Sequence, residues 1–250
     1  MKKVFFISLL TITMVSCAEL TSVLGTLGST TGVTQEENAA GLKAALNLGI
    51  ETAVKSLGVK DGFFNDVMLK ILLPKEAQTI AENIKLIPGG SDLVDRAVLS
   101  MNRAAEDAVN EATPIFKNAI LSMSFSDAMG ILFGGDNAAT EYLKKTTYTQ
   151  LQNAFAPKIK VSLDKPLVFN TSTTKTWNSL TSAYNTVANN PIGAVAGLKP
   201  VNVDLEQYVT GKALDALFVK VAQEEKAIRV NPAERVTSLL QRVFGQLDKK

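Results

Sequence analysis

Residues 91–112 read SDLVDRAVLSMNRAAEDAVNEA and form the most regular amphipathic pattern of the chain. Apolar side chains recur there at steps of three and four residues, which is the spacing of one face of an α-helix. These side chains are Val94, Ala97, Val98, Met101, Ala104, Ala105, Ala108 and Ala112. Most of them are small, which lets neighbouring helices approach closely. We therefore expect a helix that is capped by Ser91 or Asp92 and packs against several others.

The same periodicity continues along the chain on both sides of this helix. It predicts helices from Glu37 to a C-cap at Gly58, from Phe63 to Leu73, after Pro74, after Pro114, after a cap at Ser126, from Asp136 to Leu163 with a kink at Pro157, from Thr174 to Ala188, from a cap at Asp204 to before Asn231, and from Pro232 onward. Only residues 166–173 favour a short strand. The predicted fold class is all-α, a single domain of about ten helices in an orthogonal or bundle-like arrangement.

The N-terminal segment differs from this helical pattern. Two lysines precede an apolar run from Val4 to Val15, and the only cysteine of the chain, Cys17, follows. This order resembles a bacterial lipoprotein signal. An ordinary secretory signal and an uncleaved membrane anchor are the alternatives, although 12 residues fall short of the roughly 20 that span a bilayer. The resemblance implies cleavage before Cys17, a diacylglyceryl thioether on its sulfur and an acyl group on the new amine.

Three segments follow from this interpretation. Residues 1–16 are the signal peptide, residues 17–37 are a lipidated flexible tether rich in Ser, Thr and Gly, and residues 38–250 are the helical domain. The lipid on Cys17 would hold the protein on a membrane. Ala18 stands where an Asp would resemble an inner-membrane retention signal. We therefore expect a location in the cell envelope, at the outer membrane and facing the periplasm.

The composition excludes several classes of function. Removal of the signal peptide takes away Lys2 and Lys3 and leaves 24 basic and 24 acidic residues, so the neutral mature chain is not expected to bind nucleic acid. Histidine is absent, and lipid would occupy the only thiol. These absences exclude Ser-His-Asp and Cys-His catalysis as well as His-ligated zinc or haem. We predict no cofactor and no metal, although an all-oxygen cation site remains an alternative.

A series of ordered motifs extends over almost the whole mature chain. They are Asp61-Gly62-Phe63, Leu73-Pro74, Met101-Asn102-Arg103-Ala104-Ala105-Glu106, Pro114-Ile115-Phe116, Asp127-Ala128, Ala138-Ala139-Thr140, Tyr208-Val209-Thr210, Glu224-Glu225, Ile228-Arg229, Asn231-Pro232 and Val243-Phe244-Gly245. Through them the chain resembles the bacterial family called domain of unknown function 4197. The resemblance implies a helical, envelope-associated protein. It supplies neither an activity nor a cofactor.

Two polar clusters are the candidate site residues. On the helix of residues 91–112, Asn102, Glu106 and Asn110 recur at four-residue steps, and Arg103 lies three residues before Glu106. They form a polar patch that contacts a ligand or another helix, or else a solvated face with an Arg103–Glu106 ion pair.

The second cluster consists of Glu224, Glu225, Arg229, Asn231 and Arg235, around the junction of the last two helices. Glu225 and Arg229 are four residues apart and can pair along the helix. Arg235 is expected in the first turn after Pro232, where a cation opposes the helix dipole unless an acid compensates it. Either Glu224 or Glu225 answers Arg235 in a structural clamp, or the arginines receive an anionic ligand.

The leading prediction is a non-catalytic envelope lipoprotein that binds an apolar or amphipathic ligand, or a partner protein of the envelope. One alternative is a hydrolase that uses Glu106 with Glu224 or Glu225. Another is a structural scaffold. The aromatic residues Phe169, Trp177 and Tyr184 would line a binding surface or belong to the core.

Overall fold

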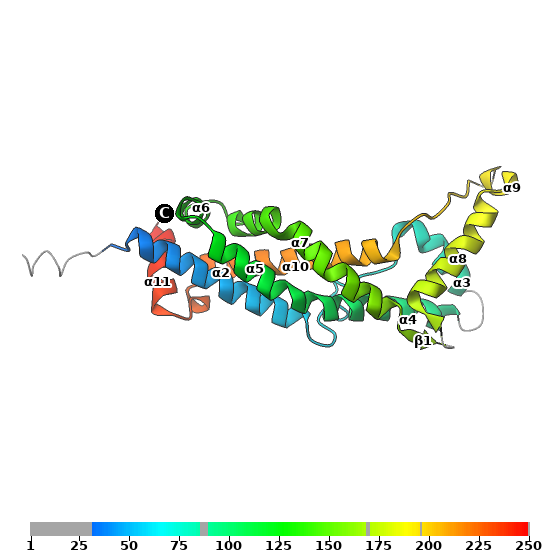
Figure 1. The fold of residues 1–250 in the computed structure, drawn as a ribbon, viewed down its shortest axis with the longest axis horizontal. Helices are drawn as coiled ribbons and strands as arrows, with labels where there is room; N and C mark the ends of the chain where they lie inside the picture. The colour runs from blue at the N-terminus through cyan, green and yellow to red at the C-terminus, as the bar shows by residue number, and fades with distance from the viewer. Residues whose placement is uncertain (1–31, 86–89, 169–170, 196, 250) are drawn as a thin grey trace, which may run out of the picture. The chain divides into compact units, whose positions relative to one another are not determined.

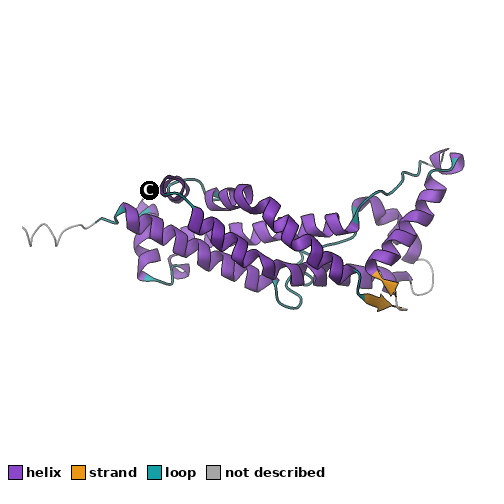
Figure 2. Cartoon of the chain, viewed as in Figure 1, coloured by secondary structure: helices purple, strands orange, loops and turns teal. Residues whose placement is uncertain are grey.

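The chain folds almost entirely into helices (Figures 1 and 2). The computed structural model describes residues 32–85, 90–168, 171–195 and 197–249. Its elements are α2 (Gln35–Leu57), η1 (Lys75–Ala77), α3 (Gln78–Lys85), α4 (Gly90–Ala108), η2 (Val109–Glu111), α5 (Ala112–Ser122), α6 (Phe125–Leu132), α7 (Ala138–Leu163), β1 (Pro166–Val168), β2 (Thr171–Ser172), α8 (Thr173–Ala188), α9 (Pro191–Val195), α10 (Leu205–Val230), η3 (Pro232–Glu234), α11 (Ser238–Gly245) and η4 (Leu247–Lys249). The predicted all-α fold is confirmed.

Four long helices form the body of the fold. Helix α7 packs against α10, α4 and α5, and α2 packs against α10, α5, α6 and α11. Figure 1 shows α2, α5, α7 and α10 running beside one another. Aromatic rings fill the space between them: Phe218 of α10 meets Phe116 of α5 edge-on, with ring centroids 5.9 Å apart, and stacks on Tyr148 of α7.

Helix α2 illustrates how periodicity produces this packing. Its buried face repeats at three- and four-residue steps and consists of Asn38, Gly41, Leu42, Ala45, Leu46, Gly49, Ile50, Ala53, Val54 and Leu57. Glycines on this face admit close neighbours: a Cβ at Gly41 would lie 2.5 Å from Cγ2 of Val243. The helix ends at Leu57, and Gly58 donates its amide to the carbonyl of Val54 over 2.7 Å, as its predicted capping role requires.

Several predicted elements are wrong in detail. Residues 63–73 form turns and extended chain instead of a helix. The cap of α6 is Ser124, which exchanges hydrogen bonds with Asp127 in a capping box, and Ser126 lies inside the helix. Helix α4 begins at Gly90, so Ser91 and Asp92 occupy its first turn. Proline 232 opens only the short η3, and Thr237 caps α11.

Other predictions agree with the structure. Asp204 caps α10 by accepting the amide of Gln207 over 3.0 Å. The segment that favoured a strand contains β1 and β2, which pair antiparallel. Helix α7 continues through Pro157 to Leu163. None of the helices in the described ranges is both long and apolar enough to cross a membrane.

The contacts group Gln35–Lys250 into one compact unit, separate from the residues before it. Residues 35–37, which we assigned to the tether, already belong to α2. The signal peptide of residues 1–16, the lipidation site Cys17, the tether up to residue 31 and Phe169 lie outside the described residues. All buried apolar side chains of the described chain belong to the compact unit, so a fragment of residues 32–250 contains a complete core.

Candidate functional site

The polar patch of α4 is buried, which differs from the predicted surface position. Asn102 is fully buried and Glu106 is 4% exposed. The amide of Asn102 brackets one residue: its Oδ1 accepts the N–H of Ile71 over 2.9 Å, and its Nδ2 donates to the Ile71 carbonyl over 2.8 Å. Glu106 Oε1 accepts the N–H groups of Phe63 and Phe64, each over 3.2 Å. The patch therefore binds the chain's own segment 61–73.

The predicted Arg103–Glu106 ion pair is present, with 2.6 Å between Nη1 and Oε2. Arg103 also donates to Asp61 over 2.7 Å. Asp61 has a φ of 71°, in the left-handed region that L-residues rarely adopt. These contacts explain why residues 63–73 are not helical. Side chains of α4 satisfy their backbone amides, so the segment needs no hydrogen bonds of its own.

The second cluster holds three helix ends together. Glu225 of α10 accepts the N–H groups of Ala139 and Thr140 over 3.0 and 2.8 Å, at the start of α7. Arg229 pairs with Glu225 over 2.9 Å and donates to the carbonyls of Ile131 and Leu132 at the end of α6. Both charges oppose the local partial charge of a helix terminus. The predicted Glu225–Arg229 pair is confirmed, with a structural role.

Arg235 closes the end of α10 instead of opening a helix. Its guanidinium donates to the carbonyls of Ile228 and Arg229 over 3.0 and 2.7 Å and is 2% exposed. Its acidic partner is Asp248, at 2.5 Å, and not Glu224 or Glu225. Sequence analysis missed Asp248. The clamp exists with a different carboxylate, and its hydrogen bond from Arg235 holds the pKa of Asp248 below the ordinary value.

The two remaining residues of the second cluster have local roles. The side chain of Asn231 accepts the N–H of Ala233 over 3.1 Å and caps η3. Glu224 is half-buried on α10. Burial raises its pKa, and the nearby charge of Glu234 raises it further, while Lys220 opposes the shift.

The carboxylates proposed for hydrolysis serve separate networks. Within the described chain, no hydrogen bond or ion pair joins Glu106 to Glu224 or Glu225. Glu106 and Glu225 are instead filled by backbone amides and arginines. The described residues also contain no group of three or more Asp, Glu, His or Cys side chains placed to hold a metal ion. The geometry therefore gives no support to acid–base hydrolysis.

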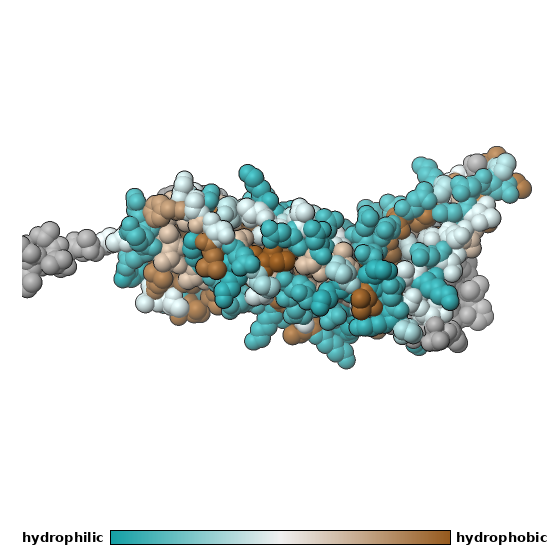
Figure 3. Space-filling model, viewed as in Figure 1, coloured by the Kyte–Doolittle hydropathy of each residue, from teal (hydrophilic) through white to brown (hydrophobic). Residues whose placement is uncertain are grey.

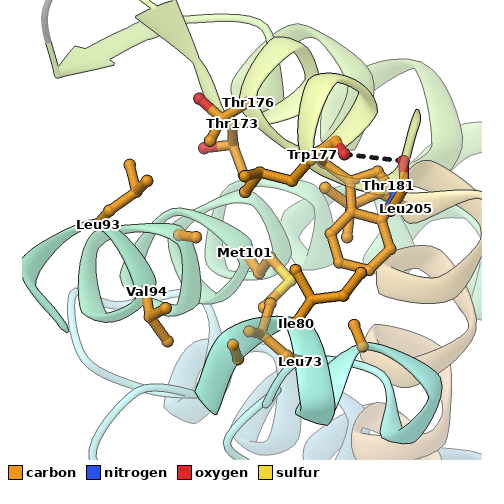
Figure 4. Close-up of a pocket in the computed structure, with 14 residues that line it drawn as sticks. Leu73, Ile80, Leu93, Val94, Met101, Thr173, Thr176, Trp177, Thr181 and Leu205 are labelled. Carbon is orange, nitrogen blue, oxygen red and sulfur yellow. Dashed lines mark hydrogen bonds between the residues drawn. The ribbon is translucent and has the colours of Figure 1, made fainter. Parts of the chain in front are cut away.

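An apolar cleft lies elsewhere, where α3, α4, α8 and the start of α10 meet (Figure 4). Its volume is about 40 Å³. Its walls are almost wholly apolar and consist of Leu73, Ala77, Ile80, Ala81, Leu93, Val94, Ala97, Met101, Thr173, Thr176, Trp177, Leu180, Thr181 and Leu205. Leu205 and Arg229 stand near opposite ends of α10, about 36 Å apart at 1.5 Å per residue. The cleft is therefore remote from the charged clamp.

Trp177 is the central side chain of this cleft. It is the only tryptophan of the chain and is 8% exposed. Figure 4 shows its ring extending from α8 toward Ile80 and Leu205. The indole Nε1 donates to the Val203 carbonyl over 3.1 Å, which fixes the loop before α10 against α8. Of the three aromatic residues considered for a binding surface, Trp177 lines the cleft, Tyr184 is half-buried on α8 and Phe169 is not described.

One polar group in the cleft has no internal partner. Thr173 is 4% exposed, and its Oγ1 makes no hydrogen bond with the described residues. Buried hydroxyls without a partner cost about 1–3 kcal/mol, so they are uncommon in folded proteins. Thr173 shares the cleft with Thr176 and Thr181 of α8, and Thr181 bonds back to the Trp177 carbonyl over 2.9 Å. Thr173 is therefore the one buried cleft hydroxyl free to meet a ligand among the described residues.

Comparison with known proteins identifies a family but no activity. The sequence model of the family described as "Protein of unknown function (DUF4197)" matches residues 32–245. No curated protein and no solved structure matches the chain. The matched range contains both the polar clusters and the cleft.

Proposed function

This chain belongs to the DUF4197 family, and we propose that it is a non-catalytic, membrane-tethered lipoprotein of the cell envelope that binds an amphipathic ligand. The binding site is the cleft between α3, α4 and α8. The observation that carries this proposal is the combination of apolar walls with one unpaired buried hydroxyl, that of Thr173. Ligand sites in proteins are commonly apolar with few polar groups that fix orientation.

The chemistry of the cleft defines the ligand class. Leucine, isoleucine, valine, methionine and alanine side chains favour an alkyl chain, and the Thr173 hydroxyl favours a carbonyl, carboxyl or hydroxyl group beside that chain. A volume of about 40 Å³ compares with about 300–1,000 Å³ for pockets that enclose drug-sized molecules. The cleft in its present form therefore admits only the end of a chain. A longer ligand requires α8 to move away from α4.

The proposed location rests on the N-terminal sequence. The order of basic residues, apolar run and Cys17 supports lipidation, and Ala18 supports retention at the outer membrane, facing the periplasm. More than one acyl chain would hold the protein stably on a bilayer. A tethered protein with an alkyl-binding cleft would meet lipids or other acyl compounds at high local concentration. A protein of the envelope with an apolar segment is the alternative partner.

Fluorescence of Trp177 tests the proposed binding directly, because this residue is the only tryptophan and lies in the cleft. Fragment 32–250 is titrated with dibromostearic acid, whose bromine atoms quench a tryptophan on contact. We expect saturable quenching. Ala97→Phe should weaken the binding at least about tenfold, because a phenyl ring fills the cleft. Thr173→Val should weaken it about fivefold, which corresponds to one lost hydrogen bond, and should raise the stability of the free protein.

Ala183→Phe is the matched control. It adds the same ring to an exposed position of α8 outside the cleft and should leave the titration unchanged. Circular dichroism verifies that each variant is folded. The proposal would be rejected if the bromo acid did not quench the wild-type protein, or if Ala97→Phe and Ala183→Phe bound it equally.

A further inference from the structure

Residues 165–203, which include α8 and α9, carry no acidic residue. The flanking acids are Asp164 and Asp204, and the only charges between them are Lys165, Lys175 and Lys199. None of these lysines takes part in an ion pair within the described chain. The mature chain as a whole is neutral, so this segment is a local concentration of unpaired positive charge.

Helix α9 folds back on the end of α8 in a specific turn. Gly193 is buried there, and a Cβ at this position would collide with the carbonyl oxygen of Val187. The Gly193 carbonyl accepts the N–H of Leu198 over 3.0 Å. This close approach turns two large apolar residues of α9 outward: Ile192 is 80% exposed and Val195 is 91% exposed.

These residues form an apolar tip, which we define as Val187, Ile192 and Val195. Val187 adds a further exposed side chain at 56%. Figure 3 shows hydrophobic colour at the end of the ribbon where Figure 1 labels α9. Exposed apolar groups gathered on a specifically built turn indicate an interaction surface. The remaining question is which partner covers it.

We propose that the apolar tip inserts into the surface of an anionic lipid bilayer, with the lysines of residues 165–203 near the headgroups. The charge pattern favours this partner. An acid-free segment meets no repulsion from anionic lipids, and lysines near such a surface are attracted to it. Apolar side chains flanked by cations are typical of segments that lie in the membrane interface. This contact goes beyond the ligand cleft and does not depend on it.

Vesicle flotation tests the proposal with fragment 32–250, which lacks Cys17 and its lipid. We expect the fragment to float with vesicles of phosphatidylcholine and phosphatidylglycerol, and less with phosphatidylcholine alone. Ile192→Ser/Val195→Ser should lower the bound fraction on mixed vesicles at least about tenfold. Lys175→Gln/Lys199→Gln should remove the difference between the two vesicle types.

Two controls separate the tip from general apolar exposure and from the cleft. Val67→Ser/Met68→Ser removes side chains that are 93% and 84% exposed elsewhere and should leave flotation unchanged. Ala97→Phe, which fills the cleft, should also leave it unchanged. Unchanged far-ultraviolet circular dichroism of the tip variant verifies its fold.

Three outcomes would overturn the proposal. The first is that wild-type fragment stays with neither vesicle type. The second is that Ile192→Ser/Val195→Ser floats as well as wild type, or that Val67→Ser/Met68→Ser lowers flotation equally. In the third, light scattering finds a dimer that Ile192→Ser/Val195→Ser dissociates while vesicles bind neither protein, which assigns the tip to a second copy of the chain.

Discussion

At the scale of single residues, the charged side chains of both clusters act on backbone ends within the protein. Glu225 and Arg229 are 8% exposed and bridge the end of α6 to the start of α7. Buried charges are tolerated when they are paired and fully hydrogen-bonded. The adjacent Glu224 lacks such a partner set and is half-buried. Two neighbouring glutamates of one helix therefore differ sharply in their contribution to stability.

Substitution of these glutamates measures that difference. Glu225→Gln should lower the free energy of unfolding by about 3 kcal/mol, because it removes the charge that pairs with buried Arg229. Glu224→Gln, the matched control, should leave stability at neutral pH unchanged or higher. Urea unfolding of fragment 32–250 gives both values. Equal destabilisation by the two substitutions would contradict the assigned roles.

The raised pKa of Glu224 also predicts a pH dependence. A carboxyl whose pKa is higher in the folded state contributes stability below its unfolded pKa, about 4.3, and loses it as pH rises through the folded pKa. The stability advantage of Glu224→Gln over wild type should therefore be present at pH 7 and should vanish below about pH 4. An advantage that stays constant from pH 7 to pH 4 would exclude this titration as its cause.

The charged residues show how far sequence reasoning reached at this scale. Spacing along one helix predicted the Glu225–Arg229 and Arg103–Glu106 pairs, because such pairs are local. Burial of Asn102 and the pairing of Arg235 with Asp248 depend on segments that folding brings together, and helical spacing holds no record of them. The capping box of Ser124 and Asp127 was the exception, since its Ser-x-x-Asp pattern was readable.

At the scale of elements, close helix contacts depend on glycine. Gly41 of α2 lies against Val243 of α11, where a Cβ would come within 2.5 Å of Cγ2. Gly211 of α10 has no atom within 4 Å of the same position. Both residues are inside helices. They therefore offer a matched comparison between packing and helix propensity.

Gly41→Ala should lower the free energy of unfolding by about 1–2 kcal/mol, because overpacking outweighs the propensity that alanine gains in a helix. Gly211→Ala should raise it by about 0.5–1 kcal/mol. Thermal or urea unfolding of fragment 32–250 measures both. In a Val243→Ala background the penalty at Gly41 should shrink. A stabilising Gly41→Ala would show that α11 does not pack on α2 as described.

Most helices were predictable because their apolar periodicity is long and regular, as in α2 and α10. Residues 63–73 were not, since their apolar side chains also fit a helical repeat. What decides their conformation is non-local: Asn102 and Glu106 of α4 bind their amides. The cleft was equally hidden from sequence, because its walls come from separate helices. Only Trp177 stood out beforehand as a candidate.

At the scale of the whole molecule, the stabilising networks and the proposed ligand site are separate. Helix α10 carries the clamp residues near its end and Leu205 of the cleft at its start. The core of α2, α5, α7 and α10 is closely packed, whereas α8 reaches the rest of the compact unit through the cleft and the bonds of Trp177 and Asn185 to the loop 201–203. This division would let α8 move without loss of the core.

Native mass spectrometry of full-length protein extracted from membranes tests the central claim, a lipid-tethered protein with an alkyl-binding cleft, most directly. The account predicts a chain that starts at Cys17, carries a diacylglyceryl and an acyl group, and retains a non-covalent adduct with the mass of an acyl compound. The adduct should be absent from Ala97→Phe and present in Ala183→Phe. An unmodified Cys17, or a wild-type protein without any adduct, would contradict the account.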